Sequence, residues 1–118
     1  MSINQSVSIK NAPNFLWGEG CNGHWLKKDG SFTIISEMMP RGASEKRHLH
    51  RGTEQFFYCL KGMLNIELNG EEHILHEGDG INIPPDAPHT VYNNSDKNVK
   101  FLVISCPNLL EDRVYVVE

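Results

Sequence analysis

The sequence predicts an all-β domain, and three observations support this fold class. Ten glycines and six prolines divide the 118 residues into short segments, many of them alternating or rich in β-branched residues. Asn69-Gly70 lies between two such segments and is a strong hairpin signal, because a type I′ turn needs positive φ at both central positions. The sequence shows no convincing helical pattern. About eight to ten short strands with tight turns favour a sandwich or barrel.

The expected strands follow one another along the chain. Residues 6–9 form a first short candidate, and the segment 13–30 is expected to be irregular, with Trp17 and Trp25 anchoring it on the core. The tail 113–117 predicts a last strand, at a sheet edge or across a dimer interface. The remaining strands are expected at 31–39, 45–50, 55–60, 63–68, 72–75, 80–83, 89–93 and 99–105.

Composition limits the classes of protein that fit. With 39% hydrophobic and 22% charged residues, the chain is expected to form one globular domain over residues 1–118. A net charge of −4 without a large basic cluster argues against nucleic acid as a partner. No apolar run is long enough to cross a membrane, and no secretory signal is evident, so we expect a cytoplasmic protein. The three cysteines are widely spaced and are interpreted as reduced and structural.

Histidines in the stretch from Gly42 to Gly62 indicate a metal site. His48 and His50 are two residues apart, so in a β-strand their imidazoles share a face and can aim at one point. A first-row metal ion requires such convergence, whereas the simpler alternative is a solvated edge strand. His89 follows a proline-rich turn and opens a strand, so it offers a third imidazole that only the fold can bring to the other two.

The spacing of these residues resembles the two motifs of the cupin superfamily. The first motif, G-x5-H-x-H-x3–4-E-x6-G, is met at Gly42, His48, His50, Gln55 and Gly62. The second motif, G-x5-P-x-G-x2-H-x3-N, is met at Gly78, Pro84, Asp86, His89 and Asn93. Asp86 replaces the usual glycine, but Asp tolerates positive φ in a turn better than most residues. The resemblance implies a small single-domain cupin, with a double-stranded β-helix or jelly-roll barrel over roughly 31–106 and strand extensions at both ends.

The resemblance also implies a metal held by three histidines and a fourth ligand, where this sequence departs from the pattern. With four intervening residues the fourth ligand is Gln55, and with three it is Glu54. Only Gln55 also leaves six residues before Gly62, and strand parity places it with Phe57 and Cys59, on the face opposite Glu54. We therefore expect the metal ligands to be His48, His50, Gln55 and His89, with Glu54 as the alternative to Gln55.

The expected cofactor is a divalent transition metal ion, namely Zn, Fe, Ni, Co or Cu, because imidazole and amide ligands suit them all. Cupins include isomerases, dioxygenases, storage proteins and sugar-sensing modules, so the fold leaves the function open. We expect a metal-dependent enzyme of isomerase or dioxygenase type acting on a small sugar-like or carboxylate-bearing molecule. The alternatives are a non-catalytic module that binds or senses a small molecule, and a structural metal site. The expected partners are a small-molecule ligand and a second copy in a homodimer.

Other residues are weaker candidates, each with a plain structural interpretation beside the functional one. The candidates to line a pocket, with ordinary core positions as the alternative, are Phe57, Met38 and Cys59. The candidates to attract an anionic substrate, with solvated side chains as the alternative, are Arg41, Lys46, Arg47 and Arg51. The candidate general bases, by polarity alone, are Glu37 and Tyr58. The histidines that fit neither motif are His24, His73 and His76.

Overall fold

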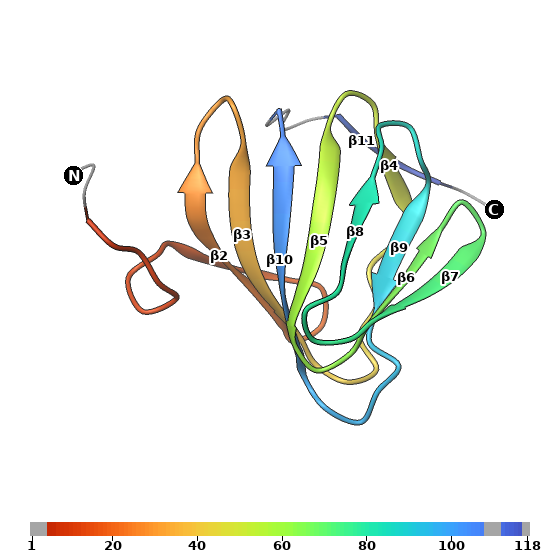
Figure 1. The fold of residues 1–118 in the computed structure, drawn as a ribbon, viewed down its shortest axis with the longest axis horizontal. Helices are drawn as coiled ribbons and strands as arrows, with labels where there is room; N and C mark the ends of the chain where they lie inside the picture. The colour runs from red at the N-terminus through yellow and green to blue at the C-terminus, as the bar shows by residue number, and fades with distance from the viewer. Residues whose placement is uncertain (1–4, 108–111, 117–118) are drawn as a thin grey trace.

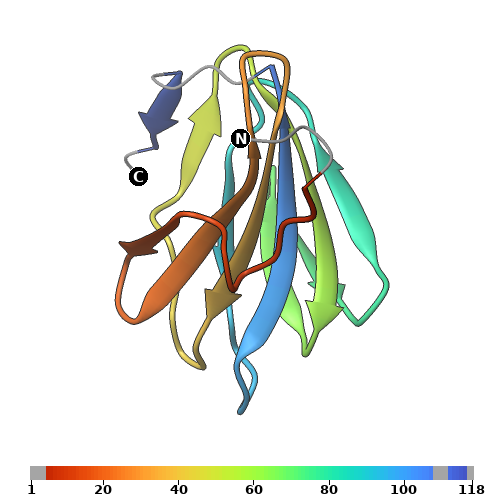
Figure 2. The same cartoon turned by 90° about the vertical axis from the view of Figure 1, so that its left-hand side faces the viewer.

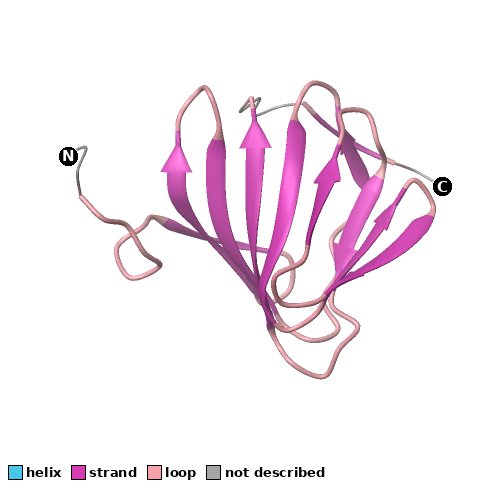
Figure 3. Ribbon diagram, viewed as in Figure 1, coloured by secondary structure: helices cyan, strands magenta, loops and turns pink. Residues whose placement is uncertain are grey.

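The structure is a computed structural model, and it describes residues 5–107 and 112–116. Within these residues every regular element is a β-strand and none is a helix (Figure 3). The strands are β1 (Asn14–Trp17), β2 (Cys21–Lys28), β3 (Thr33–Met39), β4 (His48–His50), β5 (Glu54–Lys61), β6 (Leu64–Leu68), β7 (Glu71–Leu75), β8 (Gly80–Ile83), β9 (His89–Tyr92), β10 (Val99–Cys106) and β11 (Arg113–Tyr115).

The strands form two antiparallel sheets. One sheet has the order β1-β2-β3-β10-β5-β8, and the other has the order β11-β4-β9-β6-β7. Figure 1 shows the first sheet at the left and centre and the second at the right. Figure 2, turned by 90°, places β2 in front and the pair β4 and β11 at the upper left. The prediction of an all-β double-stranded β-helix or jelly-roll barrel is confirmed.

Two local signals in the sequence lead to the predicted geometry. Asn69 and Gly70 have φ values of 52° and 87°, and they join β6 to β7 as the hairpin signal predicts. Asp86 has a φ of 67°, so it adopts the conformation that a glycine usually supplies at this motif position. Its N–H donates to the His50 carbonyl oxygen over 2.7 Å, which ties the proline-rich turn to β4.

The segment 13–30 corrects the prediction of irregular structure, because β1 and β2 pair there as an antiparallel hairpin. Gly23 lies inside β2, where a Cβ atom would come within 2.4 Å of the Phe15 ring. The glycine therefore allows a ring on one strand to pack against the backbone of the next. Trp17 packs against the core as expected. The ring of Trp25 packs instead on the ring of Phe15, with the two centroids 5.3 Å apart.

One hydrophobic core lies between the sheets. Its fully buried side chains include Met39, Leu64, Ile66 and Phe101. The motif asparagine, Asn93, is also buried, and its Nδ2 donates to the carbonyl oxygens of Met39 and Lys97 over 3.1 and 2.7 Å. These bonds fix the turn that leads from β9 to β10, so this motif position stabilises the fold.

The strand predictions also need changes at the ends of the chain. Residues 6–9 form no strand, because the Ser8 carbonyl oxygen accepts from the N–H groups of Asn11 and Ala12 in a turn. The strand expected at 45–50 is reduced to β4, with Ser44 in an isolated bridge to Tyr92. β11 pairs with β4 of the same chain and is an edge strand.

Candidate metal centre

Three imidazoles converge on the inner face of the smaller sheet. β4 and β9 are neighbours, and His48 lies directly opposite His89. His48, His50 and His89 are 2%, 9% and 0% exposed. Each offers one ring nitrogen, and these nitrogens lie within 4.8 Å of one another, so the three histidines could hold a metal ion. The fold thus brings together residues that lie about forty positions apart in the sequence.

Each imidazole is held in place by a hydrogen bond at Nδ1. The Nδ1 atoms of His48 and His89 lie 2.8 and 3.0 Å from the carbonyl oxygens of Lys46 and Ala87. A carbonyl oxygen can only accept, so Nδ1 carries the proton and Nε2 keeps its lone pair. Metal-binding histidines have this arrangement, in which the second ring nitrogen fixes the tautomer and the ring orientation.

The third imidazole, His50, is oriented by a carboxylate from the far end of the chain. Its Nδ1 lies 2.9 Å from Oδ1 of Asp112, while Oδ2 of Asp112 accepts from the N–H groups of Gly52 and Thr53. Burial opposes ionisation of Asp112, but the hydrogen bonds from His50, Thr53 and Gly52 outweigh it and lower the pKa of the carboxyl to about 2. Asp112 therefore carries a negative charge next to the imidazole.

Several ligand-type atoms in this region are buried and lack a hydrogen-bond partner among the described residues. They are Nε2 of His50, Nε2 of His89 and Oε1 of Gln55. Buried polar atoms are rarely left unpaired, because each costs about 1–3 kcal/mol. The histidine nitrogens lie within 4.8 Å of one another, so one bound cation would satisfy those of His50 and His89, and an amide oxygen is a ligand type that the same ions accept.

Gln55 and Glu54 point to opposite sides of β5, as strand parity predicts. Gln55 is 8% exposed and its Nε2 donates to Oγ of Ser105 over 3.1 Å, which leaves Oε1 as the free atom. Phe57, two residues further on the same face, has its ring 6.2 Å from the ring of His89. Glu54 is exposed, and its Oε2 accepts from Nδ2 of Asn82 over 2.9 Å.

Burial keeps two of the imidazoles neutral. It lowers the pKa of His48 to about 3, with a smaller contribution from the nearby charge of Arg113. The pKa of His89 is also lowered, chiefly by burial. A metal ion binds the neutral form of imidazole, so these side chains are in the ligand-competent state at neutral pH.

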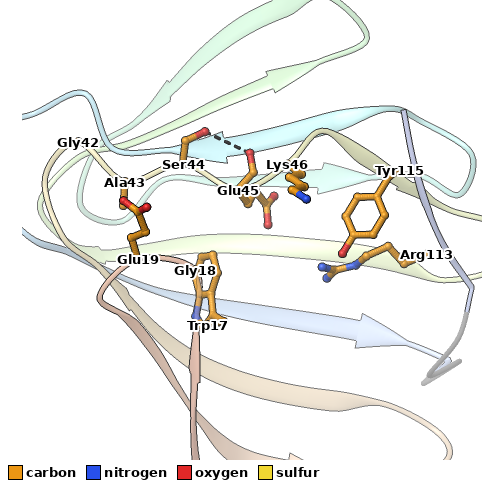
Figure 4. Close-up of a pocket in the computed structure, with 10 residues that line it drawn as sticks. All are labelled: Trp17, Gly18, Glu19, Gly42, Ala43, Ser44, Glu45, Lys46, Arg113 and Tyr115. Atoms are coloured by element: carbon orange, nitrogen blue, oxygen red, sulfur yellow. Dashed lines mark hydrogen bonds between the residues drawn. The ribbon is translucent and has the colours of Figure 1, made fainter. Parts of the chain in front are cut away.

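A cleft of about 580 Å³ lies beside the imidazoles. Figure 4 shows side chains entering it from three parts of the chain: Trp17 at the end of β1, Glu45 and Lys46 before β4, and Arg113 and Tyr115 on β11. None of the three histidines lines the cleft, but Tyr115 does, and the centroid of its ring lies 6.4 Å from that of the His48 ring. A cleft of this volume accommodates a small molecule.

Two carboxyl groups in this region, those of Glu37 and Glu45, have raised pKa values. Burial raises the pKa of Glu37 to about 8, against the opposing charge of Arg113. Burial and repulsion by Glu37 raise the pKa of Glu45 to about 8, although Arg113 and the N–H of Val91 favour its ionised form. Of the two, only Glu45 lines the cleft, and the raised pKa keeps the candidate general base Glu37 protonated at neutral pH, where it is a proton donor rather than a base.

Other candidates fall on the wrong side of the sheets or away from the imidazoles. Met38 lies on the outer face of β3, because its neighbour Met39 points into the core, so Met38 does not line a pocket inside the barrel. Tyr58 lies on the outer face of β5, because its neighbour Phe57 points into the core, so Tyr58 is not placed to act as a base there. Lys46 does line the cleft.

The remaining basic residues, cysteines and histidines take no part in the three-imidazole cluster. Arg47 forms an ion pair with Glu67, and Arg51 is exposed. All three cysteines are free, and burial raises the pKa of Cys21 to about 11 and also raises that of Cys59, which makes both poor nucleophiles. The cluster found among the described residues excludes His24, His73 and His76.

Three residues contribute to this region without a signal in the sequence that marks them, namely Glu45, Asp112 and Arg113. Glu45 precedes the histidines by a few positions, but nothing marks it as buried. Asp112 and Arg113 lie about sixty residues from His50 in the chain, and only the pairing of β11 with β4 brings them close. The one available signal was the predicted strand at 113–117, whose partner the sequence does not reveal.

A barrel of two antiparallel sheets with three converging imidazoles on its inner face has the architecture of a cupin. The family model for the cupin domain matches residues 34–105, and the chain belongs to this family. Among known proteins, quercetin 2,3-dioxygenase of Bacillus subtilis (strain 168) is 30% identical over 83 residues, which are 70% of this chain and 24% of the dioxygenase. The chain thus spans about a quarter of the length of that relative.

Solved structures share the fold at lower sequence identity. The polyketide cyclase RemF from Streptomyces resistomycificus superposes with a TM-score of 0.81 at 18% identity, over 97% of this chain and 87% of that one. A sugar phosphate isomerase of the cupin superfamily from Silicibacter pomeroyi DSS-3 gives a TM-score of 0.76 at 20% identity, over 86% and 75% of the two chains. Residues 5–107 and 112–116 contain no helix that is long and apolar enough to span a membrane.

Proposed function

We propose that this protein is a metal-dependent enzyme of isomerase or dioxygenase type that acts on a small sugar-like or carboxylate-bearing molecule. The observation that carries the proposal is the set of buried, unpaired ligand atoms of His50, His89 and Gln55 beside a polar cleft. The similar proteins support the choice of reaction classes, since they include a dioxygenase and a sugar phosphate isomerase.

The proposed ligands are His48, His50, Gln55 and His89, and the proposed metal is one of Zn, Fe, Ni, Co and Cu. All four ligands are neutral, so none of them offsets the charge of a divalent ion. Such an ion, when bound, would polarise a substrate oxygen or increase the acidity of a bound water. Asp112 orients His50, and Ser105 orients Gln55, so both ligand atoms are directed before an ion arrives.

The cleft favours an enzyme over a purely structural metal site. A structural site is closed, whereas this one adjoins a space that Trp17, Lys46 and Tyr115 line. The carboxyl of Glu45 lines the cleft, and burial raises its pKa to about 8, so at neutral pH it is placed to donate a proton to a molecule that enters. A module that only captures a ligand has no need of such a group.

Elemental analysis followed by substrate screening tests this proposal. The purified protein is first analysed for first-row metals, then assayed for isomerisation of sugar phosphates and for oxygen consumption with small carboxylates. We expect turnover with at least one compound, and loss of that turnover in His89→Ala but not in the surface variant His76→Ala. Metal binding with ligand binding and no turnover would favour the binding module instead.

A further inference from the structure

Arg113 lies on the strand next to two of the histidines and faces the same side. β11 pairs with β4 so that Arg113 is opposite His50 and Tyr115 is opposite His48. Directly opposed side chains of an antiparallel pair share a face, with Cβ atoms about 4.5–5.5 Å apart. Figure 4 shows the guanidinium of Arg113 directed into the cleft. The cation therefore stands beside the imidazoles, with open space in front of it.

The guanidinium of Arg113 forms no ion pair within 4 Å among the described residues, although its charge acts on the carboxyls of Glu37 and Glu45, whose pKa values burial raises to about 8. The ion pairs of this part of the chain involve other groups, such as Arg47 with Glu67 and His50 with Asp112. An arginine on the inner face of a barrel without an ion-pair partner is suited to bind an anion from solution. Its planar fork of N–H donors matches the oxygens of a carboxylate or a phosphate.

The cleft is polarised along its length. Lys46 adds a second cation near Arg113, with Nζ 5.8 Å from the centroid of the Tyr115 ring. Figure 4 shows Glu19 at the opposite end, Glu45 in the middle beside Lys46, and Trp17 forming part of the wall. An oxyanion fits the end near Arg113, while carboxyl oxygens at the other end are placed to accept hydrogen bonds from hydroxyl groups.

We propose that Arg113, with Lys46 and Tyr115 beside it, binds the oxyanion of a small polyhydroxylated substrate, so that the adjoining atoms of that substrate face the three imidazoles. The carboxylate of a sugar acid and the phosphate of a sugar phosphate share this chemistry. The identification of the bound molecule as a substrate rests on the proposed function, whereas the binding of an oxyanion by Arg113 does not.

Anion binding to the metal-free protein tests the proposal without metal or turnover. Protein treated with EDTA is titrated with inorganic phosphate and with acetate, against sodium chloride at equal ionic strength. The readout is the Nε–Hε resonance of Arg113 in nitrogen-correlated NMR spectra, assigned by its loss in Arg113→Met. We expect a saturable shift with phosphate, acetate or both, and none with chloride. The tighter of the two anions identifies phosphate or carboxylate as the substrate group.

Matched variants separate a specific site from general charge. Affinity for the anion is expected to fall about tenfold or more in Arg113→Met and less in Arg113→Lys, because lysine keeps the charge without the fork. Lys100→Met removes the same charge from an exposed position on β10 and is expected to leave affinity unchanged. If Arg113→Met does not fold, two measurements still test the proposal. They are the anion titration of the wild type and the affinity of Lys46→Met for the same anion.

The opposite results would overturn the proposal. A resonance that moves no more with phosphate or acetate than with chloride excludes the subsite, even if the protein binds metal. Equal losses of affinity in Arg113→Met and Lys100→Met also exclude it. A saturable shift in a protein that never takes up metal would leave the subsite in place and refute the proposed function alone.

Discussion

The two parts of the candidate site are constructed differently. At the imidazoles, His48, His50 and His89 are buried and each is fixed by a hydrogen bond at Nδ1. In the cleft, Arg113 and Tyr115 are exposed. The ammonium group of Lys46 lies over the ring of Tyr115, at 5.8 Å from its centroid. The first part is preorganised to hold an ion, while the second has side chains free to adjust around a molecule that enters.

The difference separates the residues that are placed to bind an ion from the residues that are placed to contact a small molecule. The rigid part consists of residues that match short sequence motifs, and it fits the same kind of ion in any protein with those motifs. The adaptable part comes from the end of β1, from β11 and from the positions between Gly42 and His48 that the motif leaves unspecified.

Removal of one imidazole is expected to have the largest effect. His89→Ala deletes a fully buried ligand candidate and should weaken metal binding by at least about a hundredfold, more than the loss of an outer-sphere partner typically does. Competition titration with a chromogenic chelator measures the affinity. His24→Ala is the matched control and should bind metal like the wild type, so equal binding by both variants would contradict the assignment.

The neighbours Gln55 and Glu54 give a second, sharper test of the rigid part. Gln55→Ala should weaken metal binding about tenfold or more, because it removes an oxygen that lies buried without a partner. Glu54→Ala should leave the affinity unchanged, since its carboxylate is exposed and bonded to Asn82. The same chelator titration measures both affinities. A loss of affinity confined to Glu54→Ala would show that Glu54, and not Gln55, is the ligand.

Asp112 offers a smaller perturbation, because it acts on the metal only through His50. Asp112→Asn removes the charge that accepts from Nδ1 of His50 and should lower metal affinity about tenfold. Asp96→Asn, at an exposed turn position, serves as the control. Isothermal titration calorimetry with the reconstituting metal gives both values. Unchanged affinity in Asp112→Asn would mean that this carboxylate only stabilises the loop at Gly52 and Thr53.

A further expected effect is a pH dependence of stability that comes from the carboxyl of Glu37 on β3. Burial raises the pKa of Glu37 from 4.5 to about 8, so folding favours the protonated form of this group. Its contribution to stability is complete below pH 4.5 and is lost as the pH rises from 4.5 towards 8, by at most about 1.4 kcal/mol per pH unit.

Urea unfolding of the metal-free protein between pH 5 and 8 measures this contribution. Glu37→Gln should show a flatter decline of the free energy of unfolding than the wild type, and the exposed control Glu71→Gln should not. Parallel declines in the wild type and in Glu37→Gln would show that this carboxyl is already ionised in the folded state.

The sequence predicted that His48, His50 and His89 come together, and the structure confirms this grouping, whereas Gln55 as the fourth ligand stays a prediction. Strand parity separates Gln55 from Glu54, and Asn69-Gly70 sets the β6–β7 hairpin, without knowledge of distant residues. The β1–β2 hairpin was missed because Gly23 looks like a strand breaker until the Phe15 ring is seen to occupy the space that a side chain would take.

The cleft could not be predicted, since its residues meet only through long-range pairing. Arg113 is part of a short strand that could lie against any free edge, and no pattern in the sequence indicates that the edge is β4. Met38 was misplaced for a related reason: the face of β3 that points inwards depends on the register with β10, in which Met38 lies opposite Lys100.

An anomalous-scattering crystal structure of the protein, reconstituted with its metal and measured at the absorption edge, tests the central claim most directly. The account predicts one strong peak per chain within about 2.0–2.2 Å of Nε2 of the three histidines and near Oε1 of Gln55. A protein that takes up no metal on reconstitution, or a peak away from His48, His50 and His89, would contradict it.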